Sequence, residues 1–320
     1  MMEAQQYSLG YKVKNVLRVA WTLPFVLASI TGVAFALTFK QEWLMALVIP
    51  LDVLLLAMFV NLSNDYFDHK SGADKLRFTL LNQAFEEIVV KEKGGKSIYW
   101  QGNSFDRGLI SDEAGKAILV LLAVGAVGLS IPIILYGGWI VLVLGAIAFF
   151  LSYFYTAPPL NLGARGLGEL DVMASFTMIS FFSFFVIAQQ FSWPALVVGI
   201  IVGIGAMIMR IVDEMSGKEA HIAAGEKDLV VRFGVDKVAS ILIGILAVMY
   251  GLVLLLTYYH LTFAVLFLTL PFGISMIRHL RNKADKFREM RPVFDALRLS
   301  LVQAILVIIS LSMQTFLTSV

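Results

Sequence analysis

The chain has no cysteine, and only 15% of its 320 residues are charged. Disulfide bonds, a thiol nucleophile and a cysteine-ligated metal are therefore excluded. Soluble domains carry roughly 25% charged residues, whereas 59% of this chain is hydrophobic. A chain this apolar cannot cover a globular surface with polar groups. The composition predicts an integral membrane protein, and the net charge of +2 is too small to indicate a nucleic-acid partner.

Nine segments are apolar enough to cross a bilayer as helices, which takes roughly 20 residues each. We therefore expect residues 1–320 to form a single all-α domain, a polytopic bundle of nine transmembrane helices around a central cavity. The predicted spans are 19–39, 44–64, 114–133, 138–157, 170–190, 193–213, 237–257, 260–279 and 293–318.

The basic residues are distributed very unevenly between the two sides that these spans define. With the N-terminus in the cytoplasm, 24 of the 25 Lys and Arg residues fall on the cytoplasmic side, and only Lys40 falls on the other. This bias is typical of membrane proteins. The long cytoplasmic connections are predicted to be cap loops over an active site, one at 65–113 and one at 214–236.

A first polar cluster stands at the end of the second predicted span. On a helix, Asn61, Asp65 and Asp68 recur at spacings of four and three, and Asn64 lies one turn before Asp68. Two carboxylates one turn apart repel each other unless a cation bridges them. Mg²⁺ prefers such oxygen ligands and completes its shell with water and substrate phosphate. The alternative is a helix end whose acids merely face water.

A second cluster follows the sixth predicted span. Arg210, Asp213, Glu214 and His221 fall on one helical face, with Glu219 close by in the sequence. An arginine beside acids is also compatible with a purely structural ion pair. Two such clusters at the cytoplasmic ends of separate helices favour a different interpretation, in which they hold two cations across one diphosphate.

Three segments resemble the UbiA superfamily of intramembrane prenyltransferases. The run Asn-Asp-Tyr-Phe-Asp at 64–68, with Asp74 after it, resembles the first aspartate-rich motif of that superfamily. The run 155–169 is similar to the signature after its fourth span, and 224–234 is similar to the end of its second motif. The second motif departs from the pattern, because His221 stands where many relatives carry the final aspartate.

The resemblance implies a Mg²⁺-dependent transferase of prenyl groups (EC 2.5.1 type) in the cell membrane, with its active site on the cytoplasmic side. An allylic prenyl diphosphate, geranyl or longer, would alkylate a small aromatic or lipid acceptor. The implied roles are as follows: catalysis, Asn64, Asp65, Asp68 and Asp213; metal binding, Asp65, Asp68, Asp74, Asp213, Glu214 and Glu219; diphosphate binding, Arg107, Arg165, Arg210 and Lys218; substrate pocket, Asn61, Tyr153 and Tyr155.

The acceptor stays open at this point. The first motif looks most like the branch that prenylates 1,4-dihydroxy-2-naphthoate in menaquinone biosynthesis. Hydroxybenzoate, haem, a chlorin and a glycerol-phosphate ether lipid are the alternatives within the superfamily. From another class, a secondary transporter would place its charges near the midplane, whereas here they cluster at one surface. A phospholipid head-group transferase would need an aspartate spacing that the sequence lacks.

Overall fold

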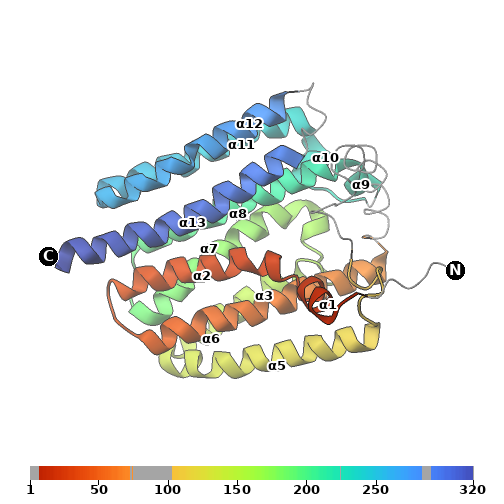
Figure 1. Cartoon of the computed structure of the whole chain (residues 1–320), viewed down its shortest axis with the longest axis horizontal. Coiled ribbons are helices and arrows are strands. Elements are labelled where there is room, and N and C mark those ends of the chain that lie inside the picture. Colours follow the sequence, from red (N-terminus) through yellow and green to blue (C-terminus); the bar gives the residue numbers. More distant parts are fainter. Residues whose placement is uncertain (1–6, 73, 75–102, 224, 283–289, 320) are drawn as a thin grey trace.

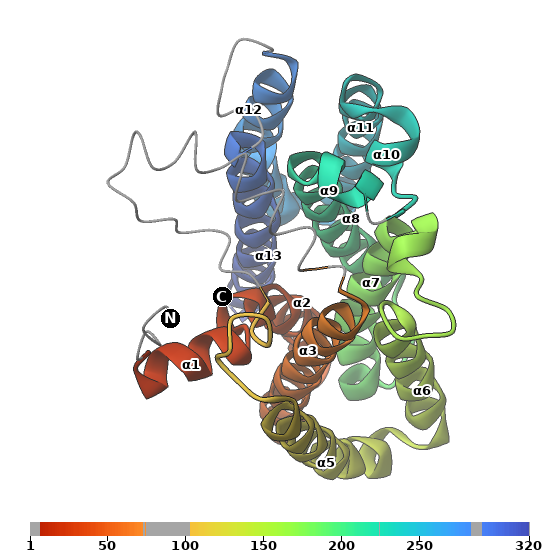
Figure 2. The same ribbon diagram turned by 90° about the vertical axis from the view of Figure 1, so that its right-hand side faces the viewer.

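The computed structural model describes residues 7–72, 74, 103–223, 225–282 and 290–319, and every regular element within these ranges is helical (Figures 1 and 2). A π-helical turn, Gly163–Leu167, leads into α7, and a 3-10 helix, Leu261–Thr269, leads into α12. The α-helices are α1 (Leu9–Val16), α2 (Val19–Leu37), α3 (Trp43–Ser71), α5 (Asp112–Gly137), α6 (Trp139–Phe154), α7 (Gly168–Ala188), α8 (Trp193–Ser216), α9 (Lys218–Ala223), α10 (Leu229–Phe233), α11 (Val235–Tyr259), α12 (Leu270–Arg281) and α13 (Met290–Ser319).

Seven helices in the described part of the chain are long and apolar enough to cross a membrane. They contain α3, α5, α7, α8, α11, α12 and α13. α2 meets the same test only together with α1, across a bend of 57°, and α6 has 16 residues. The all-helical membrane fold is therefore confirmed, whereas the nine-span count and the cytoplasmic N-terminus stay predictions.

The helix boundaries follow local capping chemistry and change the extent of both predicted cap loops. α3 runs on to Ser71 and ends where Gly72 adopts a φ of 76°, which favours glycine. The first seven residues of the predicted loop 65–113 are thus the last turns of a helix, and residues 75–102 lie outside the described residues. The predicted loop 214–236 contains α9 and α10, and α10 begins at the N-cap Asp228.

Helices α2, α7 and α8 pack at close range because small residues stand at their crossings. A β-carbon on Gly32 of α2 would lie 1.9 Å from the carbonyl oxygen of Ser180 on α7, and one on Gly203 of α8 would lie 2.4 Å from that of Met173. Buried hydroxyls add a polar contact between α2 and α7, with Thr31 Oγ1 2.9 Å from Ser180 Oγ. Small residues and interhelical hydroxyl pairs are common devices for helix association in membranes.

α8 lies at the centre of the bundle. It packs against α2, α7, α11 and α13, and 78% of its apolar stretch is buried, the highest share among the seven spans. Figure 2 views the bundle from the end that carries α1 and α9, with α8 between α7 and α13. Side chains near the end of α8 share one cavity with side chains of α2, α3 and α7.

Candidate active site

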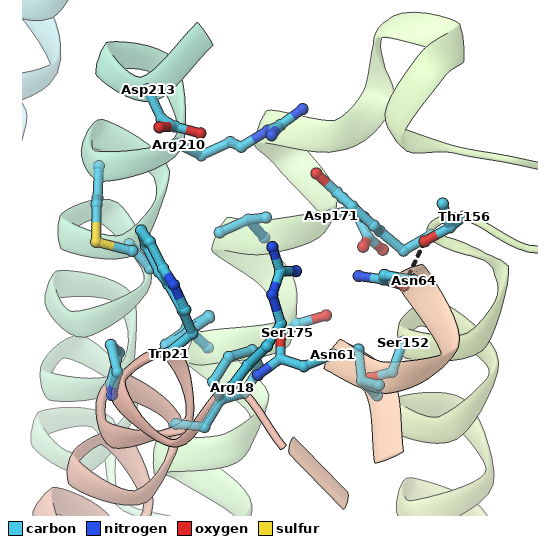
Figure 3. Close-up of a pocket in the computed structure, with 18 of the residues that line it drawn as sticks. Arg18, Trp21, Asn61, Asn64, Ser152, Thr156, Asp171, Ser175, Arg210 and Asp213 are labelled. Atoms are coloured by element: carbon cyan, nitrogen blue, oxygen red, sulfur yellow. Dashed lines mark hydrogen bonds between the residues drawn. The ribbon is translucent and has the colours of Figure 1, made fainter. Parts of the chain in front are cut away.

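A cavity of about 240 Å³ lies between these helices, near the end of the bundle that carries α1 and α9. Its inner walls are largely apolar, and its polar side chains come from several helices (Figure 3). Polar or charged lining residues are Arg18, Trp21, Asn61, Asn64, Asp68, Asp74, Ser152, Tyr155, Thr156, Asp171, Ser175, Arg210 and Asp213. Apolar lining residues are Pro24, Phe25, Val60, Val172, Phe176, Ala206, Met209, Val293 and Leu297.

Three of the predicted metal ligands border this cavity from different elements. Asp68 stands on the last turns of α3, Asp74 follows the end of that helix, and Asp213 stands near the end of α8. Asp74 is buried, and its Oδ2 accepts a hydrogen bond from Asn103 Nδ2 at 2.8 Å. The two acidic motifs, about 140 positions apart in the chain, thus meet at one cavity.

Asp65 has a different environment, although it lies in the same motif. The residue is 1% exposed and does not line the cavity. Its Oδ1 lies 3.2 Å from an Arg18 guanidinium nitrogen, and its Oδ2 accepts a hydrogen bond from the Ser104 N–H. Burial lowers the pKa of Arg18, but Asp65, Asp74 and Asp68 together raise it above its usual value. Arg18 is therefore a permanent cation among the acids of the first motif.

Arg18 was missed by sequence reasoning, which counted it only among the cytoplasmic charges. It occupies the break between α1 and α2 with a φ of 47°, a left-handed conformation that turns the chain there. The only signal in the sequence was its place directly before the first predicted span.

The second motif is divided between the cavity and the protein interior. Arg210 and Asp213 line the cavity on one side, and Asn64, Thr156 and Asp171 stand on the other (Figure 3). Glu214 is fully buried instead, and its Oε1 lies 2.7 Å from Arg210 Nε. The Arg210 guanidinium also lies 5.9 Å from the centre of the Tyr155 ring. Glu214 therefore balances and orients Arg210 from behind the cavity.

Several other predicted site residues lie away from the cavity. Tyr153 packs against Phe67 and Phe149. Arg107 donates a hydrogen bond to Tyr11 Oη at 2.7 Å, and Arg165 donates one to the Pro159 carbonyl oxygen at 2.8 Å. Lys218 and Glu219 stand on α9, outside the cavity lining, and Glu219 is exposed. The structure thus brings Asn61, Asn64, Asp68, Asp74, Tyr155, Arg210 and Asp213 together, but leaves these five residues elsewhere.

Asp171 and its neighbours form a part of the site that sequence reasoning did not identify. Asp171 is 7% exposed and lines the cavity from the first turn of α7, with Ser175 one turn further on. Thr156 lines it too and donates a hydrogen bond to Asn64 Oδ1. Asp171 falls inside the predicted span 170–190, and an acid within a membrane span is a functional candidate by default. That rule, applied to the predicted span, finds Asp171.

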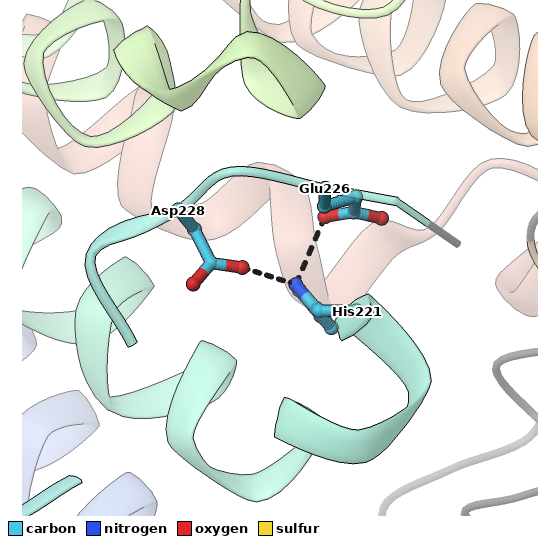
Figure 4. A group of neighbouring side chains, drawn as sticks. All are labelled: His221, Glu226 and Asp228. Carbon is cyan, nitrogen blue, oxygen red and sulfur yellow. Dashed lines mark hydrogen bonds and ion pairs between the residues drawn. The ribbon is translucent and has the colours of Figure 1, made fainter. Parts of the chain in front are cut away.

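His221 belongs to a separate buried cluster (Figure 4). Its Nδ1 lies 2.7 Å from Asp228 Oδ2 and 2.9 Å from Glu226 Oε2, and the three ligand atoms are close enough together to hold a metal ion. Burial favours the protonated Asp228 carboxyl, but its hydrogen bonds with His221 and the Val231 N–H prevail and lower its pKa. The cluster lies outside the cavity lining and fastens α9 to the N-terminus of α10.

Comparisons with known proteins find relatives that match most of the chain. Residues 23–302 match the model of the UbiA prenyltransferase family. A curated protein from Synechocystis sp., 2-carboxy-1,4-naphthoquinone phytyltransferase, is 25% identical over 278 residues, which cover 86% of this chain and 82% of the relative.

Solved structures of the same kind are similar over nearly the whole chain. A UbiA homolog from Archaeoglobus fulgidus bound to DMAPP and Mg²⁺ has a TM-score of 0.67 at 14% identity and covers 94% of this chain and 99% of its own. A digeranylgeranylglyceryl phosphate synthase has a TM-score of 0.57 at 15% identity, with coverages of 94% and 97%. At these identities the likeness concerns the fold.

Proposed function

Because this chain belongs to the UbiA prenyltransferase family, we propose that it moves the prenyl group of an allylic prenyl diphosphate onto 1,4-dihydroxy-2-naphthoate or a closely related quinone precursor. The transfer of a prenyl group follows from the family. The naphthoate acceptor is supported by the first motif, which resembles the menaquinone branch, and by the similarity to a phytyltransferase whose name specifies a carboxylated naphthoquinone.

One observation carries the proposal: carboxylates of both acidic motifs and two arginines meet at a cavity whose inner walls are apolar. Asp68, Asp74 and Asp213 offer oxygen ligands from three separate places in the fold, which is the donor set that Mg²⁺ takes in diphosphate sites. These residues therefore fit Mg²⁺. Asp65 is not included among the proposed ligands, because its carboxylate already forms an ion pair with Arg18. When bound, Mg²⁺ neutralises charge on the departing diphosphate.

The cationic side chains of the cavity are suited to hold the diphosphate oxygens. Arg18 and Arg210 both line the cavity and present several N–H donors each. They take the place of Arg107, Arg165 and Lys218, which lie elsewhere. Glu214 and Tyr155 fix the position of Arg210, so little conformational freedom is lost when the diphosphate binds.

The apolar part of the cavity is suited to the prenyl group. As the allylic carbon–oxygen bond breaks, the electron pair leaves with the diphosphate and positive charge develops on the allylic fragment. Phe25, Phe176 and Val172 line the inner wall and exclude water, which would otherwise capture that fragment. The aromatic faces add cation–π stabilisation. The acceptor carbon then forms the new carbon–carbon bond.

The test is a prenyl-transfer assay with the purified chain in lipid nanodiscs. Radiolabelled geranyl diphosphate is supplied with Mg²⁺ and with one acceptor at a time: 1,4-dihydroxy-2-naphthoate, 4-hydroxybenzoate, haem, a chlorin or a glycerol-phosphate ether lipid. We expect a prenylated product with the naphthoate and none after EDTA treatment, with activity restored by added Mg²⁺.

Two results would contradict parts of this proposal. Alkylation of another acceptor in preference to the naphthoate would refute the acceptor assignment and leave prenyl transfer intact. Uptake of the labelled diphosphate into closed vesicles without release of diphosphate would instead support the transporter alternative.

A further inference from the structure

Three buried polar atoms at the cavity have no hydrogen-bond partner and belong to residues that make no ion pair among the described residues, unlike Arg210, which pairs with Glu214. They are Asn61 Nδ2 on α3, and Asp171 Oδ1 and Ser175 Oγ on α7. All three atoms are inaccessible to solvent, and Asp171 and Asn61 as whole residues are only 7% and 8% exposed. All three residues line the cavity and are labelled in Figure 3.

Unpaired groups of this kind are costly for a folded protein. A buried polar atom without a partner loses its hydrogen bonds to water and gains nothing in return. Asp52, another buried acid of a membrane span, lies away from the cavity and accepts a hydrogen bond from Ser130 at Oδ2, although its Oδ1 is unpaired too. Asp52 thus presents one isolated unpaired atom, whereas the cavity gathers three from different residues. Three unpaired groups at one cavity therefore indicate a polar ligand that satisfies them together.

The position of Asp171 identifies which ligand this is. A carboxylate repels the negatively charged diphosphate, and no cation of the described residues pairs with Asp171. Asp171 and Ser175 are four residues apart and share one face of α7, so Ser175 lies about 6 Å deeper along the helix axis. Asp171 thus begins a polar stripe that leads inward, towards the region where the prenyl group would lie.

We propose that Asp171, Ser175 and Asn61 form the acceptor subsite, that they bind the hydroxyl edge of a hydroxyaromatic molecule, and that Asp171 takes the proton of that hydroxyl during alkylation. This rests on the proposed prenyl transfer and goes beyond it. Any carboxylate on the acceptor must point away from Asp171, because two anions would repel each other.

The proposed alkylation conserves atoms and charge. As the allylic carbon–oxygen bond breaks, its electron pair leaves with the diphosphate. The O–H proton of the acceptor moves to the Asp171 carboxylate, and the ring carbon next to that hydroxyl forms the new bond, which leaves a ring ketone. The hydrogen on the alkylated carbon then moves to the ketone oxygen and restores the aromatic hydroxyl. Asp171 releases its proton to solvent, so one proton and one diphosphate leave for each prenyl group transferred.

The experiment compares Asp171→Asn and Ser175→Ala with wild type and with Asp52→Asn, a matched exchange of a buried acid outside the cavity. All four chains are assayed in nanodiscs at saturating geranyl diphosphate and Mg²⁺, with 1,4-dihydroxy-2-naphthoate and its two monomethyl ethers. Donor binding is measured separately without acceptor, which also reports whether each variant is folded.

We expect Asp171→Asn to lower kcat about 100-fold, the low end of the range for a general base. Ser175→Ala should raise the acceptor KM about tenfold, the effect of one lost buried hydrogen bond. Donor affinity should stay within about twofold in both, and Asp52→Asn should match wild type. One monomethyl ether should react poorly with wild type, and Asp171→Asn should discriminate less against it.

Other outcomes overturn the inference. It is wrong if Asp171→Asn keeps the wild-type kcat and acceptor KM, or if it loses donor binding as well, which would indicate a structural role. It is also wrong if both ethers react like the parent compound. A wild type that consumes no geranyl diphosphate with any acceptor would instead refute the proposed function itself.

Discussion

Asp65 and Asp68 stand three residues apart on α3, yet different groups surround their carboxylates. Asp68 borders the cavity, whereas Asp65 is buried behind it beside Arg18 and the N–H of Ser104. Both were expected to bind metal, since the helical spacing places them on one stripe. Because Arg18 already neutralises Asp65, removal of the charge should affect mainly stability at Asp65 and mainly activity at Asp68.

We predict that Asp68→Asn lowers the turnover number about 100-fold or more, because a charge that offsets the developing diphosphate charge is lost. The unfolding temperature should change little. In Asp65→Asn the partly exposed Arg18 loses its partner, which should cost on the order of 2 kcal/mol, between the values for exposed and buried ion pairs. Steady-state kinetics and thermal unfolding in detergent measure the two effects. If Asp68→Asn and Asp65→Asn lost the same activity and had the same stability, the two carboxylates would not have the different roles that we predict.

Asp213 and Glu214 are neighbours in the sequence but face opposite environments. Asp213 lines the cavity, and Glu214 is buried against Arg210. We predict that Asp213→Asn raises the Mg²⁺ concentration needed for half-maximal donor binding about tenfold, comparable with the loss of a supporting ligand contact. Glu214→Gln should leave that midpoint within about twofold but destabilise the fold by about 3 kcal/mol, because Arg210 loses its buried partner. A Mg²⁺ titration of donor binding measures the midpoint, and thermal unfolding measures the stability of each variant. An unchanged midpoint in Asp213→Asn would remove Asp213 from the metal site.

At the scale of helices, the cavity depends on how closely α2, α7 and α8 approach one another. Gly32 and Gly203 allow these contacts, and the hydroxyls of Thr31 and Ser180 meet across the first of them. α2 carries Trp21 and Phe25, and α7 carries Asp171 and its neighbours, so the separation of the two helices sets the width of the cavity.

We predict that Gly32→Ala destabilises the protein by about 1–3 kcal/mol, the usual cost of overpacking. The added β-carbon would lie 1.9 Å from the Ser180 carbonyl oxygen, so α2 and α7 must separate. Gly128→Ala is the control, because no atom lies within 4 Å of a β-carbon there. That exchange should be neutral or stabilising by up to about 1 kcal/mol. The unfolding temperature and the rate of prenyl transfer should both fall in Gly32→Ala, and neither should fall in Gly128→Ala. Equal unfolding temperatures and equal rates in the two variants would refute the close contact between α2 and α7.

At the scale of the whole molecule, the polar site stands at one end of the bundle. α1, α9 and α10 lie at that end, whereas the connection between α2 and α3 and the end of α13 lie at the other (Figure 1). In the part of the chain that the structure describes, the basic residues stand at or near the helix ends on the same side as α1 and α9, with Lys40, between α2 and α3, the exception. The charge bias predicts that the end with the cavity faces the cytoplasm.

The absence of cysteine makes this orientation directly testable. We predict that single cysteines at the exposed positions Lys14 and Glu219 react with a membrane-impermeant maleimide only when the cytoplasmic face is accessible. Cysteines at Lys40 and at Tyr258, which is 92% exposed, should react only from the opposite side. Intact cells and inverted membrane vesicles provide the two conditions. Labelling of all four positions from one side would refute the predicted topology.

Some features of this protein are determined by the sequence alone, because they depend on composition or on neighbours along the chain. The membrane class follows from the apolar content, since polar groups cannot cover such a chain. The first aspartate-rich motif and its helix follow from local spacing, and α3 does carry Asn61, Asn64 and Asp68 to one cavity.

The tertiary structure decides which of the candidate residues meet. Arg18 reaches Asp65 because the chain turns between α1 and α2, and Asp171 of α7 lines the same cavity as Asn61 of α3 because the two helices are brought together in the bundle. Arg107 and Arg165 had the right charge, but each is held by a local hydrogen bond away from the cavity. Residue type and periodicity define which chemistry a side chain can perform. Which partner it faces depends on the packing of helices distant in the sequence, and no local pattern encodes that.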